Sequence, residues 1–127
     1  MHQVLQKVKK PKISVQKEKE LISIVIPVYN EEKSIKNVLE RIPNHRPMEI
    51  IVVDDGSTDK SVEMVRRVEN KNIKLLSHNR NQGYGASVKT GFNYASGDII
   101  VTLDSDGQHL PEELPHLIEP IINNKAD

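Results

Sequence analysis

The chain has 127 residues, of which 36% are hydrophobic and only 3% aromatic, so it can build at most one domain, with a core of isoleucine, valine and leucine. It contains no cysteine, which excludes a disulfide framework, a thiolate zinc site and a thiol nucleophile. No apolar run is long enough to cross a bilayer, and the first residues lack the apolar core of a signal peptide, so we expect a soluble domain.

The net charge of zero conceals an asymmetry between the two ends of the chain. Residues 1–20 carry six lysines against two glutamates, a charge of +4, so residues 21–127 carry −4. We expect residues 1–20 to be a basic, disordered tail that is simply solvated; the alternative is a weak electrostatic contact with an anionic membrane surface. Nucleic acid is a poor partner, because the remainder is acidic and offers almost no aromatic side chains for base stacking.

Two strand–helix units are predicted first. Residues 21–28 are nearly all apolar, which is typical of a central strand buried on both faces. Asn30 is expected to cap the following helix, whose apolar residues recur at helical spacing. Residues 49–53 predict a second strand, and Ser57 or Thr58 is expected to cap the helix after it.

Two further units follow. Residues 73–77 predict a third strand, and the helix after it is expected from about Tyr84 to Ala95. The β-branched run at residues 98–103 predicts a fourth, buried strand. A last helix is expected to begin at Pro111, and Pro120 should kink or split it. This alternation indicates an α/β domain with a parallel sheet and right-handed crossovers.

The stretch Asp104-Ser105-Asp106-Gly107-Gln108-His109 directly follows the fourth expected strand. In an extended backbone residues i and i+2 point the same way, so Asp104 and Asp106 can aim both carboxylates at one point. Two such charges repel unless a cation lies between them, and a hard divalent ion fits, with Gln108 adding a neutral oxygen. The alternative is a plain turn, because Asp, Ser and Gly are ordinary turn residues.

Unusual residues gather after every expected strand, at 27–31, 54–59, 78–85 and 104–109. The carboxyl ends of parallel strands share one edge of the sheet, and a crevice opens there if the strand order reverses between the first and fourth strands. There is no Gly-x-Gly-x-x-Gly turn after the first strand and no Walker lysine motif. A cation held by the two aspartates is therefore the expected means of neutralising a bound diphosphate.

Four motifs occur in order along residues 21–127: SIVIPVYNEE at 23–32, IVVDDGSTD at 51–59, NRNQGYG at 79–85 and DSDGQH at 104–109. Together they resemble the motifs of family 2 glycosyltransferases with the GT-A fold. The D-x-D-x-Q-H form is most similar to polyprenyl-phosphate sugar synthases of the dolichyl-phosphate mannosyl- and glucosyltransferase type. The resemblance implies a Rossmann-like three-layer sandwich with a mainly parallel sheet, incomplete at the C-terminus because only the donor-binding portion is present.

The resemblance also implies roles for residues of the first two motifs. Pro27, Tyr29 and Glu31 would line the nucleoside pocket, although the alternative for Tyr29 is that it only packs. Val53 and Asp55 would hold the base, with Asp55 accepting a hydrogen bond from a ring N–H.

The last motif is implied to bind the metal and the diphosphate. Asp104 and Asp106 would bind Mg²⁺ or Mn²⁺ across the diphosphate of a sugar nucleotide, and Gln108 would complete the metal shell. Ser105 would contact the nucleotide through its backbone. His78, Arg80 and His109 are interpreted as loop residues.

The implied reaction is inverting transfer of a sugar from a nucleotide-diphosphate donor, of the GDP-mannose or UDP-glucose type, to a polyprenyl phosphate. A lipid phosphate is already ionised at neutral pH, so no general base is required and we assign no catalytic side chain. The implied location is the cytoplasmic face of a membrane, with peripheral contact. Exposed apolar sheet edge or helix surface could drive homo-oligomer formation.

The family continues into an acceptor-side region, and often membrane helices, beyond the donor half. Two alternatives to a sugar transferase therefore stay open for the sequence. One is a nucleotide-binding or interaction module without turnover. The other is a nucleotidyltransferase that uses the acids for its metal. The absence of a glycine- and arginine-rich loop after the first strand speaks against the second alternative.

Overall fold

The computed structural model describes residues 4–7 and 20–124. Their elements are, in chain order, β1 (Val4–Lys7), β2 (Ile22–Val28), α1 (Ile35–Glu40), β3 (Met48–Asp54), α2 (Ser61–Arg66), β4 (Ile73–Ser77), α3 (Tyr84–Tyr94), β5 (Ile99–Thr102), η1 (Pro111–Glu113) and α4 (Leu114–Asn123). The strands form a five-stranded sheet in the order β1-β5-β2-β3-β4. All are parallel except β1, which runs antiparallel to β5. The expected α/β fold with a mainly parallel sheet is therefore confirmed.

The strand order reverses at β2. The chain runs from β2 outward to β3 and β4, and then crosses back to form β5 on the other side of β2. In the register of the sheet, Val28 lies opposite Asp54 on β3, and Val25 lies opposite Thr102 on β5. The loops that leave β2, β3, β4 and β5 therefore meet at one edge, with the reversal between them, which is where open α/β sheets bind ligands.

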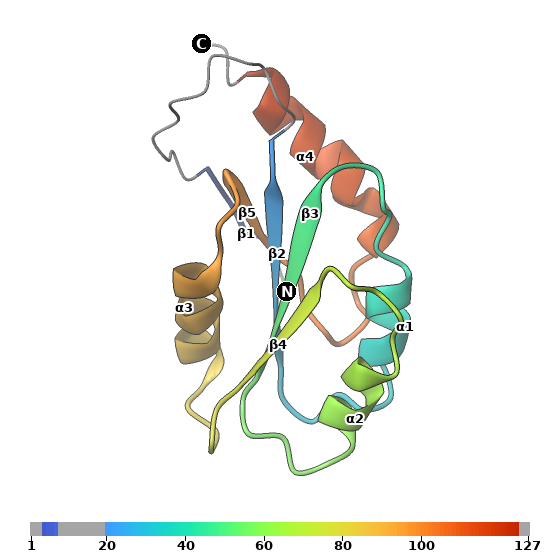
Figure 1. The fold of residues 1–127 in the computed structure, drawn as a ribbon, viewed down its shortest axis with the longest axis vertical. Helices are drawn as coiled ribbons and strands as arrows, with labels where there is room; N and C mark the ends of the chain where they lie inside the picture. The colour runs from blue at the N-terminus through green and yellow to red at the C-terminus, as the bar shows by residue number, and fades with distance from the viewer. Residues whose placement is uncertain (1–3, 8–19, 125–127) are drawn as a thin grey trace.

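Helices cover both faces of the sheet: α3 lies on one face, and α1, α2 and α4 lie on the other (Figure 1). Residues along β2 alternate between these layers, because successive side chains of a strand point to opposite faces. Ile24 and Ile26 belong to the large cluster with α1 and α4, whereas Val25 belongs to the smaller cluster that includes Phe92 of α3. All three are fully buried, and each such side chain contributes about 1.5–3 kcal/mol through burial.

The N-terminal segment differs from the expected disordered tail at residues 4–7. They form β1, with Val4 opposite Thr102 and Lys7 opposite Ile99 of β5. An unpaired strand edge presents free N–H and C=O groups, and β1 pairs with those of β5. Residues 8–19 of the basic tail lie outside the described residues, so the boundary at residue 20 and the membrane contact stay predictions.

Two helices begin later than the sequence pattern predicts. α1 starts at Ile35 rather than after Asn30, and α2 starts at Ser61 rather than after Ser57 or Thr58. The expected caps instead join the two loops. Asn30 Oδ1 accepts from the N–H of Thr58 at 2.8 Å, and Ser57 Oγ accepts from the N–H of Asn30 at 2.9 Å. Short polar side chains bond the nearest backbone donors, and here these lie on the neighbouring loop.

Pro120 is expected to kink or split the last helix; α4 runs continuously from Leu114 to Asn123, so a split is excluded. Proline cannot donate to the carbonyl group of His116, one turn earlier. Both residues are exposed, so water can hydrogen-bond that carbonyl group. Among the described residues, no helix combines the length and apolar character needed to cross a membrane.

Candidate functional site

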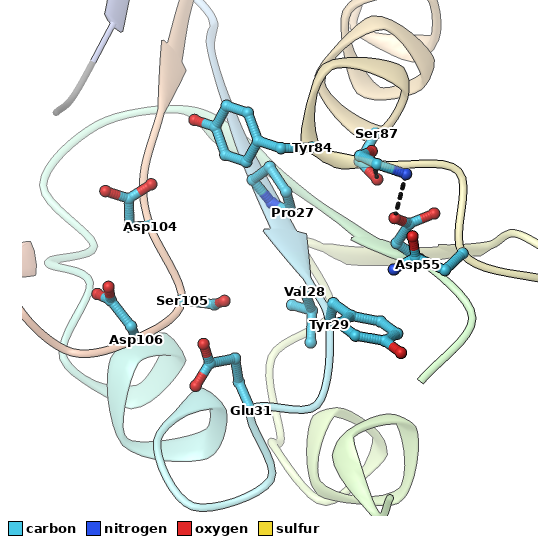
Figure 2. A pocket seen from close by; sticks show the side chains of 12 residues that line it. Pro27, Val28, Tyr29, Glu31, Asp55, Tyr84, Ser87, Asp104, Ser105 and Asp106 are labelled. Carbon is cyan, nitrogen blue, oxygen red and sulfur yellow. Dashed lines mark hydrogen bonds between the residues drawn. The ribbon is translucent and has the colours of Figure 1, made fainter. Parts of the chain in front are cut away.

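The loops after β2, β3, β4 and β5 enclose a cavity of about 350 Å³. The end of β2, all four loops and α3 contribute the lining residues: Pro27, Val28, Tyr29, Glu31, Asp55, Asn81, Gly83, Tyr84, Ser87, Asp104, Ser105 and Asp106. Figure 2 shows Asp104 and Asp106 on one side of the cavity, Asp55 on the opposite side, and Pro27 and Tyr29 between them. A cavity with convergent polar groups at a reversal of strand order is the expected ligand site of such a sheet.

Carboxylates form one wall of this cavity. Asp104 is buried at 7% exposure, Asp106 is half-buried, and Glu31 approaches them from the loop after β2 (Figure 2). Burial raises the pKa of Glu31, and the negative charges of Asp106 and Asp59 raise it further. This wall therefore has a negative potential that favours a cation.

Ser34, just before α1, anchors the loop that carries these acids. Its Oγ donates to the backbone carbonyl oxygen of Ser105 at 2.6 Å and lies 3.3 Å from Glu31 Oε1. Within the loop, Asp106 Oδ1 accepts from the backbone N–H of Gln108 at 3.0 Å. The acidic loop is thus fastened to the loop after β2 across the reversal of strand order.

Asp55 forms the opposite wall and is 3% exposed. Its Oδ1 accepts from the backbone N–H of Gln82 at 2.8 Å and lies 2.8 Å from His78 Nδ1, while its Oδ2 accepts from the N–H of Gly83 at 2.8 Å. Burial alone would raise the pKa of Asp55, but these hydrogen bonds outweigh it and hold the pKa below its usual value. Asp55 is therefore an ionised side chain that organises the loop after β4.

Gly56 allows the loops after β3 and β4 to touch. Its φ is +75°, and a Cβ atom there would lie 2.6 Å from the carbonyl carbon of Arg80 and 2.7 Å from the backbone nitrogen of Asn81. Only glycine combines this left-handed conformation with so close a backbone approach. Asp54 serves the same turn, since its Oδ2 accepts from the N–H of Ser57 at 3.1 Å.

Seven of the nine predicted site residues line the cavity: Pro27, Tyr29, Glu31, Asp55, Asp104, Ser105 and Asp106. Val53 does not, because its side chain points into the core between the sheet and α3 and is fully buried. The side chain of Gln108 is exposed outside the cavity. The functional roles of all nine stay predictions.

Sequence reasoning missed several lining residues, among them Asn81, Tyr84 and Ser87. The 79–85 motif was noted, but its residue types do not reveal which side chains face inward. Tyr84 stands 50% exposed at the start of α3, and burial together with the negative charge of Asp104 raises its pKa. The two histidines interpreted as loop residues both contact site acids, His78 at Asp55 and His109 at Asp104, where Nε2 lies 3.5 Å from Oδ2.

Asp104 and Asp106 are the residues best placed to hold a metal ion. Within residues 20–124 no group of three or more histidine, cysteine or acidic side chains is arranged to enclose one. Two carboxylates on one wall still fit a hard divalent cation, because Mg²⁺ is commonly bound by one or two carboxylates together with phosphate oxygens and water.

Comparison with known sequences identifies a family that matches this chain. The profile of Glycosyl transferase family 2 matches residues 23–127. A UDP-N-acetylglucosamine–dolichyl-phosphate N-acetylglucosaminyltransferase of Methanococcus voltae is 39% identical, with 84% of this chain and 49% of the relative covered. An undecaprenyl-phosphate 4-deoxy-4-formamido-L-arabinose transferase of Proteus mirabilis is 42% identical, with 76% and 32% covered. The chain thus spans about half or less of the length of these relatives.

Solved structures agree. The glucosyl-3-phosphoglycerate synthase of Mycobacterium tuberculosis in complex with UDP superposes with a TM-score of 0.72 at 28% identity, covering 84% of this chain and 41% of that one. A mannosyltransferase of Pyrobaculum calidifontis in complex with GDP-Man and Mn²⁺ gives 0.64 at 28% identity, covering 77% and 31%. The sequence match over residues 23–127 and the shared α/β architecture lead to one conclusion: the chain belongs to glycosyl transferase family 2.

Proposed function

We propose that this chain is the donor-binding part of a glycosyltransferase that transfers a sugar from a nucleoside-diphosphate sugar to a polyprenyl phosphate. The observation that carries the proposal is the cavity at the strand reversal, in which Asp55 faces Asp104 and Asp106. A nucleoside-diphosphate sugar requires two features in its binding site: a hydrogen-bond acceptor for the nucleobase and a cation-binding wall for the diphosphate.

Different residues of the cavity bind different parts of the donor. Asp55, ionised and fixed by three hydrogen bonds, accepts an N–H of the base. Pro27 and Tyr29 lie between the two acidic walls and contact the nucleoside. The backbone of Ser105, held by Ser34, contacts the nucleotide beside the diphosphate.

Asp104 and Asp106 would hold Mg²⁺ or Mn²⁺. When bound, the ion offsets the charge of the diphosphate and the charge that grows on it as the leaving group departs. Support comes from the hard oxygen donors on this wall and from the Mn²⁺ in the structure of the Pyrobaculum calidifontis mannosyltransferase. The pKa of Glu31 is raised mainly by burial, and the further rise caused by the charge of Asp106 is consistent with excess negative charge there.

The acceptor in this proposal is a polyprenyl phosphate, which places the protein at a membrane surface. Support comes from the names of the Methanococcus voltae and Proteus mirabilis relatives, which act on dolichyl phosphate and undecaprenyl phosphate. An ionised phosphate can attack the anomeric carbon directly, so the chain needs no side chain to remove a proton. The donor base and sugar are left to experiment, because the relatives and the solved neighbours differ in both.

A thermal-shift panel of UDP, GDP, CDP and TDP, each with and without Mn²⁺, tests the donor site. We expect one or two of the nucleotides to raise the Tm, and to do so more strongly with Mn²⁺. A ligand at 100 times its Kd stabilises the folded state by about 2.7 kcal/mol, which is readily measured. If no nucleotide shifts the Tm under either condition, the proposed function is wrong.

Turnover is tested with the sugar nucleotide of the preferred base, Mn²⁺ and a short polyprenyl phosphate. A glycosylated lipid supports the transferase. Nucleotide binding without product supports the alternative of a binding module without turnover for this chain.

A further inference from the structure

A buried histidine connects Asp55 to helix α3. His78 follows β4, and its side chain is only 10% exposed. Its Nδ1 lies 2.8 Å from Asp55 Oδ1, and its Nε2 lies 2.9 Å from Thr90 Oγ1 on α3. The proposed function assigns no role to this imidazole, although it touches the carboxylate that faces the base.

The chemistry of the three groups fixes the direction of these hydrogen bonds. Asp55 has a lowered pKa and is ionised, so its oxygens can only accept. His78 Nδ1 must therefore carry the proton and donate to Asp55. When the ring is neutral, Nε2 has a lone pair and accepts from the hydroxyl group of Thr90. Asp55 thereby fixes the tautomer of His78, and the hydroxyl group of Thr90, which can donate or accept, anchors Nε2 on α3.

This arrangement leaves one oxygen of Asp55 available to a ligand. Oδ1 accepts two hydrogen bonds, from His78 and from the N–H of Gln82, which occupy both of its lone pairs. Oδ2 accepts one, from the N–H of Gly83, and keeps a lone pair. Since Asp55 lines the cavity, Oδ2 is the oxygen that can accept from a bound base.

Resting on the proposed function, we propose that His78, anchored on α3 by Thr90, is a positioning residue that fixes Asp55 so that Oδ2 accepts a ring N–H of the nucleobase. The site then favours uracil, thymine or guanine, whose pairing edges carry a ring N–H, over cytosine and adenine, whose ring nitrogen there is an acceptor. A purely structural His78, one that only ties β4 to α3, would influence stability but not this discrimination.

Pairs of ligands that differ only at the ring nitrogen isolate the hydrogen bond from the base to Asp55 Oδ2. UDP is compared with N3-methyl-UDP, and GDP with N1-methyl-GDP, by calorimetric titration in Mn²⁺. Methylation removes the ring N–H, and the added bulk is the same for every variant, so it cancels when variants are compared. The variants are His78→Phe, which removes both ring nitrogens, and His78→Asn, whose amide can still donate to Asp55. His116→Phe, at an exposed histidine on α4, is the matched control.

In the wild type and in His116→Phe, methylation should weaken binding about tenfold to hundredfold, as expected for a hydrogen bond to a charged group. In His78→Phe the methylation ratio should fall severalfold toward one, and His78→Asn should restore most of it. An unchanged ratio in His78→Phe overturns the role of His78 but leaves the proposed function in place. A wild type that binds only CDP overturns the base preference and with it the role of His78, whereas one that binds none of the four nucleoside diphosphates overturns the proposed function as well.

A second pair of variants decides the matter if circular dichroism shows that His78→Phe does not fold. Thr90→Val removes the hydroxyl group that faces Nε2, whereas Thr90→Ser keeps it. A methylation ratio that falls in Thr90→Val and persists in Thr90→Ser supports the proposal. Equal ratios in these two variants overturn it.

Discussion

Gly56 is the contact point between the loop that carries Asp55 and the loop after β4, so alanine at this position tests the geometry of the site. The new Cβ would lie 2.6 Å from the carbonyl carbon of Arg80 and 2.7 Å from the backbone nitrogen of Asn81. Both are backbone atoms, which cannot rotate away as a side chain can. The two loops must therefore separate.

Two other glycines separate the two causes of the stability loss expected in Gly56→Ala, namely backbone strain and displacement of the neighbouring loop. At Gly83, φ is +104° but a Cβ would meet nothing within 4 Å, so alanine adds backbone strain alone, about 1–3 kcal/mol. Gly85, inside α3, has space and an ordinary φ, so alanine should be neutral or stabilise by up to about 1 kcal/mol. Gly56→Ala combines about 1–2 kcal/mol of left-handed strain with about 1–3 kcal/mol of displacement, about 2–5 kcal/mol in total.

Equilibrium unfolding in urea, followed by circular dichroism, measures all three variants. We expect the free energy of unfolding to fall in the order Gly85→Ala, Gly83→Ala, Gly56→Ala. A loss of 2–5 kcal/mol is large against the roughly 5–15 kcal/mol that stabilise a typical domain. If Gly56→Ala is no less stable than Gly83→Ala, the two loops do not touch at Gly56.

Further predictions concern the buried Glu49 and the anchor Ser34. Glu49 accepts from the hydroxyl of Ser23 and the N–H of Ser96, so Glu49→Gln should lower the free energy of unfolding by about 2–3 kcal/mol at pH 7; an unchanged value in urea would refute this. Burial raises the pKa of Glu49, but these hydrogen bonds outweigh it, so the net pKa is lowered. The stabilisation by the ionised Glu49 is therefore fully present above its ordinary pKa of 4.5 and is lost as pH falls through the lower folded value. The difference between wild type and Glu49→Gln should therefore shrink in acid, and a difference that grows would contradict the assignment. Ser34→Ala removes the hydrogen bond to Ser105 and should weaken nucleoside diphosphate binding in Mn²⁺ about two- to tenfold by calorimetry, whereas unchanged affinity would show that the anchor is dispensable.

The parallel part of the sheet could be predicted from the sequence because its central strands, β2, β3 and β5, are nearly continuous apolar runs that end in polar loops. Residues such as Ile24 and Ile51 leave little choice: in a parallel sheet covered on both faces, such runs must be buried. The presence of Asp55 and Asp104 at one cavity follows from the same topology, since parallel strands deliver their carboxyl ends to one edge. The strands and the edge at which their loops meet are therefore set by the local sequence pattern.

Contacts between loops could not be predicted in the same way. Asn30 looks like a helix cap, yet it bonds the loop that contains Ser57, because the distance between the loops is set by tertiary packing. His78 looks like a loop residue until the fold places Asp55 and Thr90 on either side of it. The pairing of β1 with β5 is likewise long-range, and a lysine-rich tail carries no local signal for it.

The central claim is that Asp104 and Asp106 bind a divalent cation that holds the diphosphate of a donor nucleotide. Its most direct test is calorimetric titration of the nucleoside diphosphate that binds best, with and without Mn²⁺, into the wild type and into Asp104→Asn and Asp106→Asn. We expect Mn²⁺ to tighten binding in the wild type, and both variants to lose this effect while keeping the metal-free affinity. Variants that respond to Mn²⁺ as strongly as the wild type would contradict the claim.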